Sequence, residues 1–309
     1  MNNLNRNLIS MKPLHFKVFS FMQIPYQFLP KLNARRVTIP LLSPLDEPEF
    51  SIHFAQETPF LIEADLSSLL QSALSQIQKV PKEQKIKTFD SIPYREIREG
   101  LFHNYLDYVE NSPPNCLFPK GFDVIEERLD SVTETKFRHY ALSLNESIFP
   151  EIEGFRIPWI EERNYLLNLK SNFFQMHGIT SPHWLFIHPA FSVSNAHYDH
   201  DSVHTAISQL KGRKKAYLIS PEHHATVQQE QFPRLPNGFN DFSNPLIAQL
   251  PCGTMELWEG DLGENQVLFI PRRWIHYVVS ETSGISYSQD IVNSSNLSDW
   301  LGSLFKTRT

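Results

Sequence analysis

Three residues of types that ligate iron occur in two segments far apart in the chain. His197 and Asp199 are separated by one residue, and on a β-strand this spacing turns both side chains to the same face. His276 ends the second segment, IPRRWIH. Two imidazoles and one carboxylate on one side of a metal leave its other positions open, as in non-haem Fe(II) oxygenases. The sequence therefore predicts a metal site formed by His197, Asp199 and His276.

Neighbouring residues offer competing ligands. His200 and Asp201 are out of the two-residue register of the predicted ligands, so we interpret them as groups around the site or at the surface. His204 remains a further imidazole in the same region. The alternative without a metal is a turn stabilised by the His-x-Asp pair, with His276 as a hydrogen-bonded core histidine.

The segments around the predicted ligands resemble a known family. A strand-like run at 183–190 precedes them, and SQLKGRKKAYLI follows before IPRRWIH. In this order, over residues 137–293, the chain resembles the JmjC-type cupins, the 2-oxoglutarate-dependent hydroxylases that include the HIF asparaginyl hydroxylase. Two positions depart from the family pattern. Asn265-Gln266 stands where relatives often have Gly-Asp, and Asp290, a possible second carboxylate around the iron, stands where many have Asn.

The resemblance implies that 2-oxoglutarate binds beside the iron. Lys214 matches the family lysine that binds the distal carboxylate of 2-oxoglutarate, a charge pair that a dry pocket strengthens. Tyr140 resembles the family tyrosine that donates to the same carboxylate. Ser194 stands where relatives have a Thr or Ser hydroxyl, and Thr205 is expected to add another. The alternative for Lys214 and Lys215 is a pair of solvated charges in a turn.

The succession of short strand-like runs predicts the fold class. These runs are separated by turns and lie at 184–188, 204–210, 215–219, 267–270, 275–280 and 284–292. Such a succession is typical of a mainly β protein with a double-stranded β-helix, the cupin jelly roll. Helical spacing predicts a helix over 67–79, and N-terminal helices are expected to pack on the barrel. Further helices are expected at 94–108, 122–129 and 164–177, and further strands at 50–55, 58–62 and 136–144.

The chain is expected to have three parts. Residues 1–135 form an N-terminal extension with helices and the first strands, 136–295 a JmjC-like cupin barrel, and 296–309 a short helix or tail that is a candidate for a homodimer contact. The polar segment 221–260 is predicted to be a long loop, a candidate lid or substrate-contacting insert. Arg272, in the turn before His276, is interpreted as a solvated charge.

Composition limits the partners and the compartment. The formal net charge of −6 provides no surplus of Lys and Arg for a polyanion, so nucleic acid is not favoured. Cys116 and Cys252 lack metal-type CxxC spacing and are too few for a disulfide framework. No apolar segment is long enough for a signal peptide or a membrane span. We therefore expect a cytoplasmic protein without a membrane partner.

The resemblance implies an enzyme, an Fe(II)- and 2-oxoglutarate-dependent dioxygenase that uses O2 to hydroxylate a C–H bond. A protein or peptide side chain is the first expected substrate class, and a small molecule or a tRNA nucleoside is the second. Two alternatives of other classes stay open. One is a non-catalytic cupin that serves as a binding module, and the other is a zinc or manganese cupin, such as an isomerase, with more histidine ligands.

Overall fold

The fold is known from a computed structural model. It describes residues 35–43, 52–79, 85–90, 124–128, 138–143, 160, 163–169, 182–188, 193–199, 202–229, 242 and 255–306. All of these residues belong to one compact unit, Lys31–Thr309.

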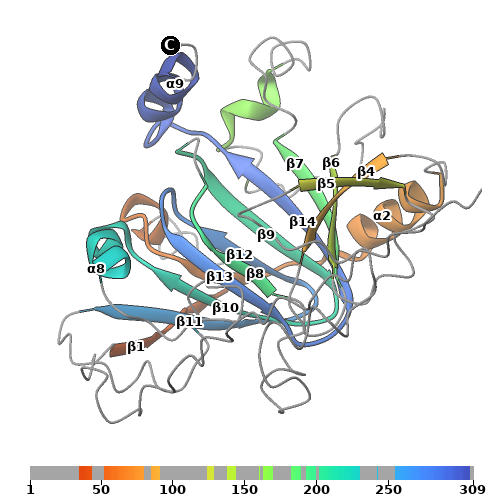
Figure 1. Ribbon diagram of the computed structural model, residues 1–309, viewed down its shortest axis with the longest axis horizontal. Coiled ribbons are helices and arrows are strands. Elements are labelled where there is room, and N and C mark those ends of the chain that lie inside the picture. The colour runs from red at the N-terminus through yellow and green to blue at the C-terminus, as the bar shows by residue number, and fades with distance from the viewer. Residues whose placement is uncertain are drawn as a thin grey trace, which may run out of the picture. The chain divides into compact units, whose positions relative to one another are not determined.

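The described strands form two sheets (Figure 1). The five-stranded sheet has the order β1, β11, β10, β13, β8, formed in that order by Arg35–Thr38, Glu256–Leu262, Lys214–Ile219, Ile275–Ser280 and Val193–His197. The nine-stranded sheet has the order β2, β3, β12, β9, β14, β7, β6, β4, β5, formed in that order by Leu41–Leu42, Phe60–Glu63, Gln266–Ile270, His204–Lys211, Gly284–Ile291, His183–His188, Arg138–Ser143, Lys85–Asp90 and Val124–Arg128. The fold is thus mainly β, a cupin jelly roll, as the sequence predicted.

The two sheets share an apolar core. Ala216 and Leu218 of β10 pack in one buried cluster with Leu268 of β12 in the other sheet. The intervening residues Tyr217 and Ile219 belong to a second cluster on the other face of β10. Because successive side chains of a strand point to opposite faces, one face of β10 lines the interior between the sheets and the other is covered from outside. This alternation decides which side chains reach the site.

Helix α2 (Ser67–Lys79) confirms the predicted helix over 67–79. Its first backbone N–H, that of Ser67, donates to the Asp65 carboxylate at 3.0 Å, and this hydrogen bond lowers the pKa of Asp65. Leu69 and Ala73 are buried in the cluster that also contains Leu185 of β7. The helix therefore covers the outer face of the nine-stranded sheet, where the drawing also places it (Figure 1).

Five local predictions in the N-terminal half had different outcomes. Residues 52–55 are helical rather than a strand, and 124–128 form strand β5 rather than a helix. β5 pairs with β4, and short apolar runs such as these take the structure that their neighbours stabilise. The predicted strands at 58–62 and 136–144 are confirmed by β3 and β6. The predicted helix at 94–108 lies outside the described residues.

The predicted loop 221–260 contains regular structure at both ends. Its start forms the 3-10 helix η3 (Pro221–His223) and α8 (His224–Gln229), and its end forms most of β11. β11 looks polar in sequence because Glu259 and Asp261 lie on the face away from the interior. Glu259 pairs with Arg36 at 3.0 Å, while Asp261 lies 3.6 Å from the Lys215 ammonium. β11 lies between β1 and β10, but the charged residues on one of its faces interrupt the apolar pattern by which a strand is predicted from sequence.

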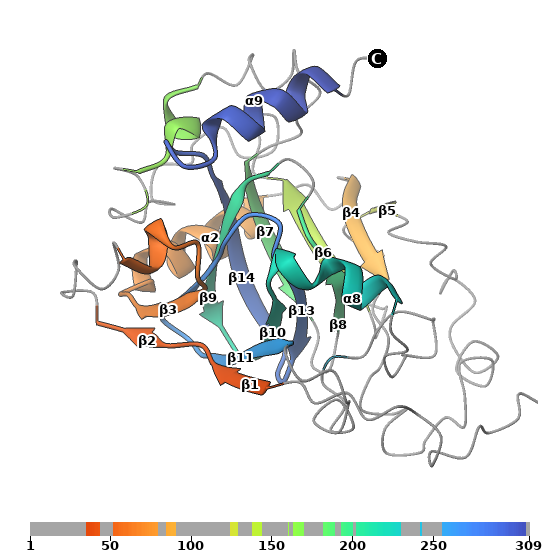
Figure 2. The same ribbon diagram turned by 90° about the vertical axis from the view of Figure 1, so that its left-hand side faces the viewer.

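The chain continues from β14 into α9 (Leu297–Lys306), which confirms the predicted C-terminal helix (Figure 2). Trp300 and Leu304 bury their side chains against Leu166 of the 3-10 helix η2 (Tyr165–Asn168), the described part of the helix predicted at 164–177. The role of α9 in a homodimer stays a prediction. None of the described helices has both the length and the apolar character that crossing a membrane requires.

Arg272 is not the solvated turn charge that its sequence position suggested. Its guanidinium Nε lies 2.9 Å from a carboxylate oxygen of Glu57, and its Nη1 pairs with Asp299 of α9. The turn before β13 therefore connects the segment before β3 to the C-terminal helix. Both partners, Glu57 and Asp299, are distant from Arg272 in the sequence, so no local sequence pattern predicts these contacts.

Candidate metal centre

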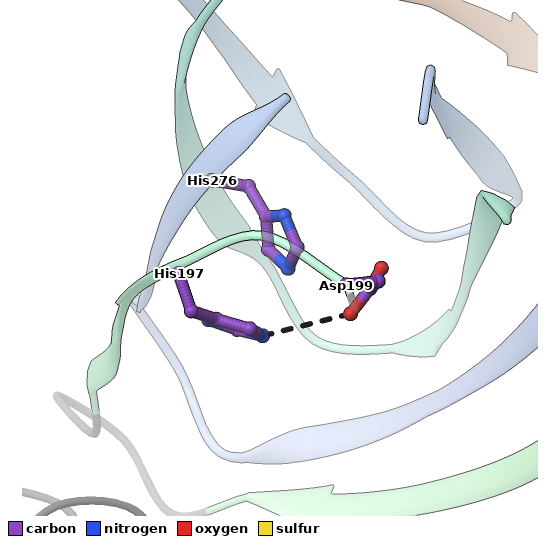
Figure 3. A group of neighbouring side chains, drawn as sticks. All are labelled: His197, Asp199 and His276. Carbon is purple, nitrogen blue, oxygen red and sulfur yellow. Dashed lines mark ion pairs between the residues drawn. The ribbon is translucent and has the colours of Figure 1, made fainter. Parts of the chain in front are cut away.

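The structure brings the three predicted ligands together at the end of β8 (Figure 3). His197, the last residue of β8, lies opposite His276 of β13, and their ring centroids are 4.1 Å apart. Asp199 follows directly, with its Oδ1 3.9 Å from His197 Nε2. One ligand atom from each residue lies within 4.8 Å of the other two. The arrangement is therefore close enough for all three to share one metal ion.

A β-bulge sets the orientation of β8. His276 pairs with His197, but Val278, two residues on, pairs with Ser194, three residues back. One extra residue in β8 thus lies between the two pairs, as in a bulge that re-aims a strand beside a site. Because residues paired across strands share a face, Ser194 and His197 both lie on the face of His276. Ser194 therefore shares a face with His197, and its contact with a co-substrate stays a prediction.

Hydrogen bonds fix the protonation and orientation of two ligands. The Nδ1–H of His276 donates to the backbone oxygen of Trp274 at 3.2 Å, which leaves the Nε2 lone pair for a metal. The hydroxyl of Thr205 donates to Asp199 Oδ2 at 2.7 Å. Sequence reasoning assigned Thr205 to the co-substrate, whereas the structure places its hydroxyl on the carboxylate of Asp199. Asp199 then presents Oδ1 toward His197.

His204, the competing imidazole, is a core histidine. Its Nδ1 accepts a hydrogen bond from the backbone N–H of Arg272, and its Nε2 donates to the Ser295 hydroxyl, each at 3.0 Å. Burial, with a smaller contribution from the Arg272 charge, lowers the pKa of His204 to about 3. With both ring nitrogens engaged, His204 has no free lone pair for a metal. His200 and Asp201 lie outside the described residues.

Lys214 is buried on the same face as the metal ligands. The β10–β13 register pairs Lys214 with Ser280 and Leu218 with His276, so the four-residue step places the lysine about 13 Å along the strand from the level of His276. Lys214 is 8% exposed, and burial lowers its pKa to about 7. In the described part of the chain no carboxylate pairs with it. The opposite Ser280 hydroxyl is also buried and has no hydrogen-bond partner there.

These two groups provide what an anion needs in a dry interior. A lysine cation and a hydroxyl face the same space without partners among the described residues, and burying such groups is costly unless something binds them. Lys215 differs, because it lies on the opposite face beside Asp261 at 3.6 Å and is one third exposed. The interpretation as two solvated turn charges is therefore correct for Lys215 and wrong for Lys214.

Comparison with known protein families matches residues 55–294 to the cupin-like domain. The chain belongs to the cupin-like domain family. In this cupin-like protein the matched region contains every strand from β3 to β14, and thus all three metal ligands and Lys214.

The interior of the cupin-like barrel holds a further polar network, which sequence reasoning missed. Ser286 donates its hydroxyl to Gln209 Oε1 at 3.0 Å, and Gln209 Nε2 donates to the backbone oxygen of Lys211 at 2.7 Å and contacts His188 Nε2 at 3.2 Å. Gln209 is four residues from Thr205 on β9 and therefore shares its face. The sequence feature that could have indicated this network is Gln209, a polar residue at a position of β9 that faces the interior.

The remaining predicted residues lie on the strands of the nine-stranded sheet. Asp290 pairs with Thr205 across β14 and β9 and so shares the face that carries the Thr205 hydroxyl. The backbone of Tyr140 lies on β6 opposite Ile187, but its side chain is outside the described part of the structure. Its contact with a co-substrate stays a prediction.

Proposed function

We propose that this cupin-like protein is an Fe(II)- and 2-oxoglutarate-dependent dioxygenase. A cluster of two histidines and an aspartate fits several cupin activities by itself. The observation that carries the proposal is Lys214, a buried cation with no acidic partner among the described residues, on the same interior face as His276. A co-substrate that chelates the metal at one end and carries a carboxylate at the other would engage the metal and the lysine together.

The donor set suits Fe(II). Two neutral imidazole nitrogens and one carboxylate oxygen are the ligands of the facial triad, and they leave three octahedral positions for other ligands. When bound, Fe(II) with chelated 2-oxoglutarate supplies the activation of O2 that oxidises a C–H bond, with succinate and CO2 as products. Hydrogen bonds from His276 to Trp274 and from Thr205 to Asp199 hold the ligands ready without a metal.

The other residues of the interior orient the co-substrate. Lys214 binds its distal carboxylate by a charge-assisted hydrogen bond, and Ser280 adds a neutral donor beside it. Between them and the metal ligands, Ala216 and Val278 pair across β10 and β13 and belong to the apolar cluster between the sheets. This apolar lining excludes water and strengthens the pairing of lysine and carboxylate. The keto acid end is thereby directed toward the metal.

We propose a protein or peptide side chain as the oxidised group. The side chains of His197 and Asp199 are 26% and 32% exposed, whereas His276 is 5% exposed. The metal centre is thus accessible from one side, which suits a reactive group presented on a large molecule. A small molecule remains the alternative, and a tRNA nucleoside is disfavoured by the net charge of −6.

The zinc or manganese alternative has less support. Such cupins usually have more histidine ligands, and both nitrogens of His204, the further histidine nearby, are already hydrogen-bonded. The binding-module alternative gives no specific reason for a buried lysine that has no acidic partner among the described residues. Both alternatives predict that 2-oxoglutarate is not consumed, so turnover separates them from the proposal.

The proposal is tested by turnover and by the spectrum of the anaerobic complex. Adding 2-oxoglutarate to the Fe(II)-loaded protein without O2 should give a weak visible charge-transfer band, and admitting O2 should form succinate slowly even without a substrate. Asp199→Ala should abolish both while the far-ultraviolet circular dichroism stays unchanged. Asp261→Ala, which removes an exposed carboxylate of β11, is the matched control and should leave both intact.

Two results would contradict the proposal. Succinate formation by the Asp199→Ala variant would show that the ligand assignment is wrong. A wild-type protein that binds Fe(II) but gives neither band nor succinate would refute the dioxygenase. For a protein with turnover, proteome-wide comparison of cells with and without the gene for a mass gain of one oxygen atom would identify the substrate.

A further inference from the structure

β8 carries His197 and leads into Asp199. In the described part of the chain it is the last strand of the five-stranded sheet and pairs with β13 alone. That pairing shifts its register between His276 and Val278. Asp199 lies beyond the end of the strand. A bulge interrupts this pairing beside His197, so contacts from other segments contribute to the position of the ligands.

His224, the first residue of α8, contacts both segments that carry ligands. Its Nε2–H donates to the backbone oxygen of Arg273 at 2.8 Å, in the turn that leads to His276. Its ring stacks on Tyr198, between His197 and Asp199, with centroids 4.9 Å apart and planes inclined by 23°. One side chain thus connects the two segments from outside the barrel.

The residues on either side of the His224 ring are held in defined conformations. Arg273 adopts a left-handed backbone conformation, with φ of 64°, which directs its carbonyl in a way that few non-glycine residues allow. Val227, one turn along α8, packs with Tyr198 against the cluster on the outer face of the five-stranded sheet. Burial lowers the pKa of His224 and thereby favours the neutral ring. A neutral ring stacks on tyrosine and retains one N–H for Arg273.

We propose that His224 is a positioning residue that holds the two ligand-bearing segments at the separation the metal requires. The role rests on the metal centre assigned above, but it concerns residues outside the ligand set. His224 acts through the Arg273 carbonyl and the Tyr198 ring, and its loss allows β8 to move relative to β13. The expected consequence is weaker metal binding with a less uniform coordination geometry, without loss of the fold.

The test measures Co(II) binding to the metal-free full-length protein by visible absorption. His224→Ala should weaken Co(II) binding about tenfold, the effect typical of residues that orient metal ligands, and broaden the d–d bands. His224→Gln, which restores a donor of similar reach, should recover most of the affinity. His224→Phe, which keeps only the stacking, should fall between them. His223→Ala removes the neighbouring imidazole, whose Nε2 faces Glu222 at 3.4 Å, and should bind as the wild type does.

The outcomes separate this inference from the proposed function. If wild-type protein binds Co(II) and His224→Ala binds it equally well with an unchanged spectrum, the positioning role is wrong and the dioxygenase proposal stands. If wild-type protein binds no Co(II), both are wrong. Should His224→Ala fail to fold, Tyr198→Leu tests the same contact from the other side. It must weaken Co(II) binding, and wild-type affinity in that variant would overturn the inference.

Discussion

Replacing Lys214 by Met should stabilise the ligand-free protein while it destroys co-substrate binding. Burial lowers the pKa of Lys214 from 10.5 to about 7, and each tenfold change in proton affinity is worth about 1.4 kcal/mol. At pH 7 the buried lysine therefore costs the folded state about 4 kcal/mol relative to the unfolded chain. Methionine is of similar length and carries no charge, so it avoids this cost.

The pH dependence shows how the stability difference between wild type and Lys214→Met should change. The folded protein releases the Lys214 proton near pH 7, whereas the unfolded chain keeps it until about pH 10.5. The cost is therefore complete below pH 7 and decreases as the pH rises toward 10.5, because the unfolded chain binds more protons in that interval. The stability advantage of Lys214→Met should fall from about 4 kcal/mol at pH 7 to about 2 kcal/mol at pH 9.

Binding of 2-oxoglutarate should change in the opposite direction. The distal carboxylate requires the charged lysine, so affinity in the wild-type protein should decrease by up to tenfold per pH unit above pH 7. Urea denaturation of the metal-free protein measures the stability, and calorimetric titration of the Mn(II)-loaded protein measures binding. Lys215→Met, which alters the exposed neighbour, is the control and should leave the binding affinity unchanged. A Lys214→Met variant that is less stable than wild type at pH 7, or that binds 2-oxoglutarate normally, would refute the reasoning.

Two other substitutions test the supports of the site and of the barrel. Thr205→Val keeps the side-chain shape but removes the hydrogen bond to Asp199. Mn(II) affinity, measured by electron paramagnetic resonance, should therefore fall about tenfold. An unchanged Mn(II) affinity would mean that Asp199 does not need this hydrogen bond. Gly284→Ala should lower stability by about 2–4 kcal/mol in urea denaturation, because a Cβ there would overlap the backbone oxygen of Lys211. Gly302→Ala is the control: its position on α9 has open space around it, so the substitution should leave the stability unchanged or raise it slightly. Equal losses of stability in the two glycine variants would contradict the steric explanation.

The sequence was sufficient to predict those features that depend on local patterns of residues. Apolar alternation located most strands of the jelly roll, and helical spacing located α2 and α9, because each of these elements buries a regular face. The sequence also predicted that His197 and Asp199 share a face, since a two-residue spacing on a strand has this effect regardless of the rest of the fold, and the structure brings His276 beside them. Strand β11 was missed where charged residues on its outer face concealed the alternation.

Other features depended on contacts between distant segments, which only the tertiary structure decided. Lys214 and Lys215 are adjacent and chemically identical, yet the strand register buries one in the barrel and exposes the other. Thr205 reaches Asp199, and His204 becomes a core histidine, because β9 lies beside the ends of β8 and β13. Residue type and spacing determined which groups this protein possesses, whereas the pairing of strands determined which of them meet, because side-chain direction is local and proximity across a sheet is not.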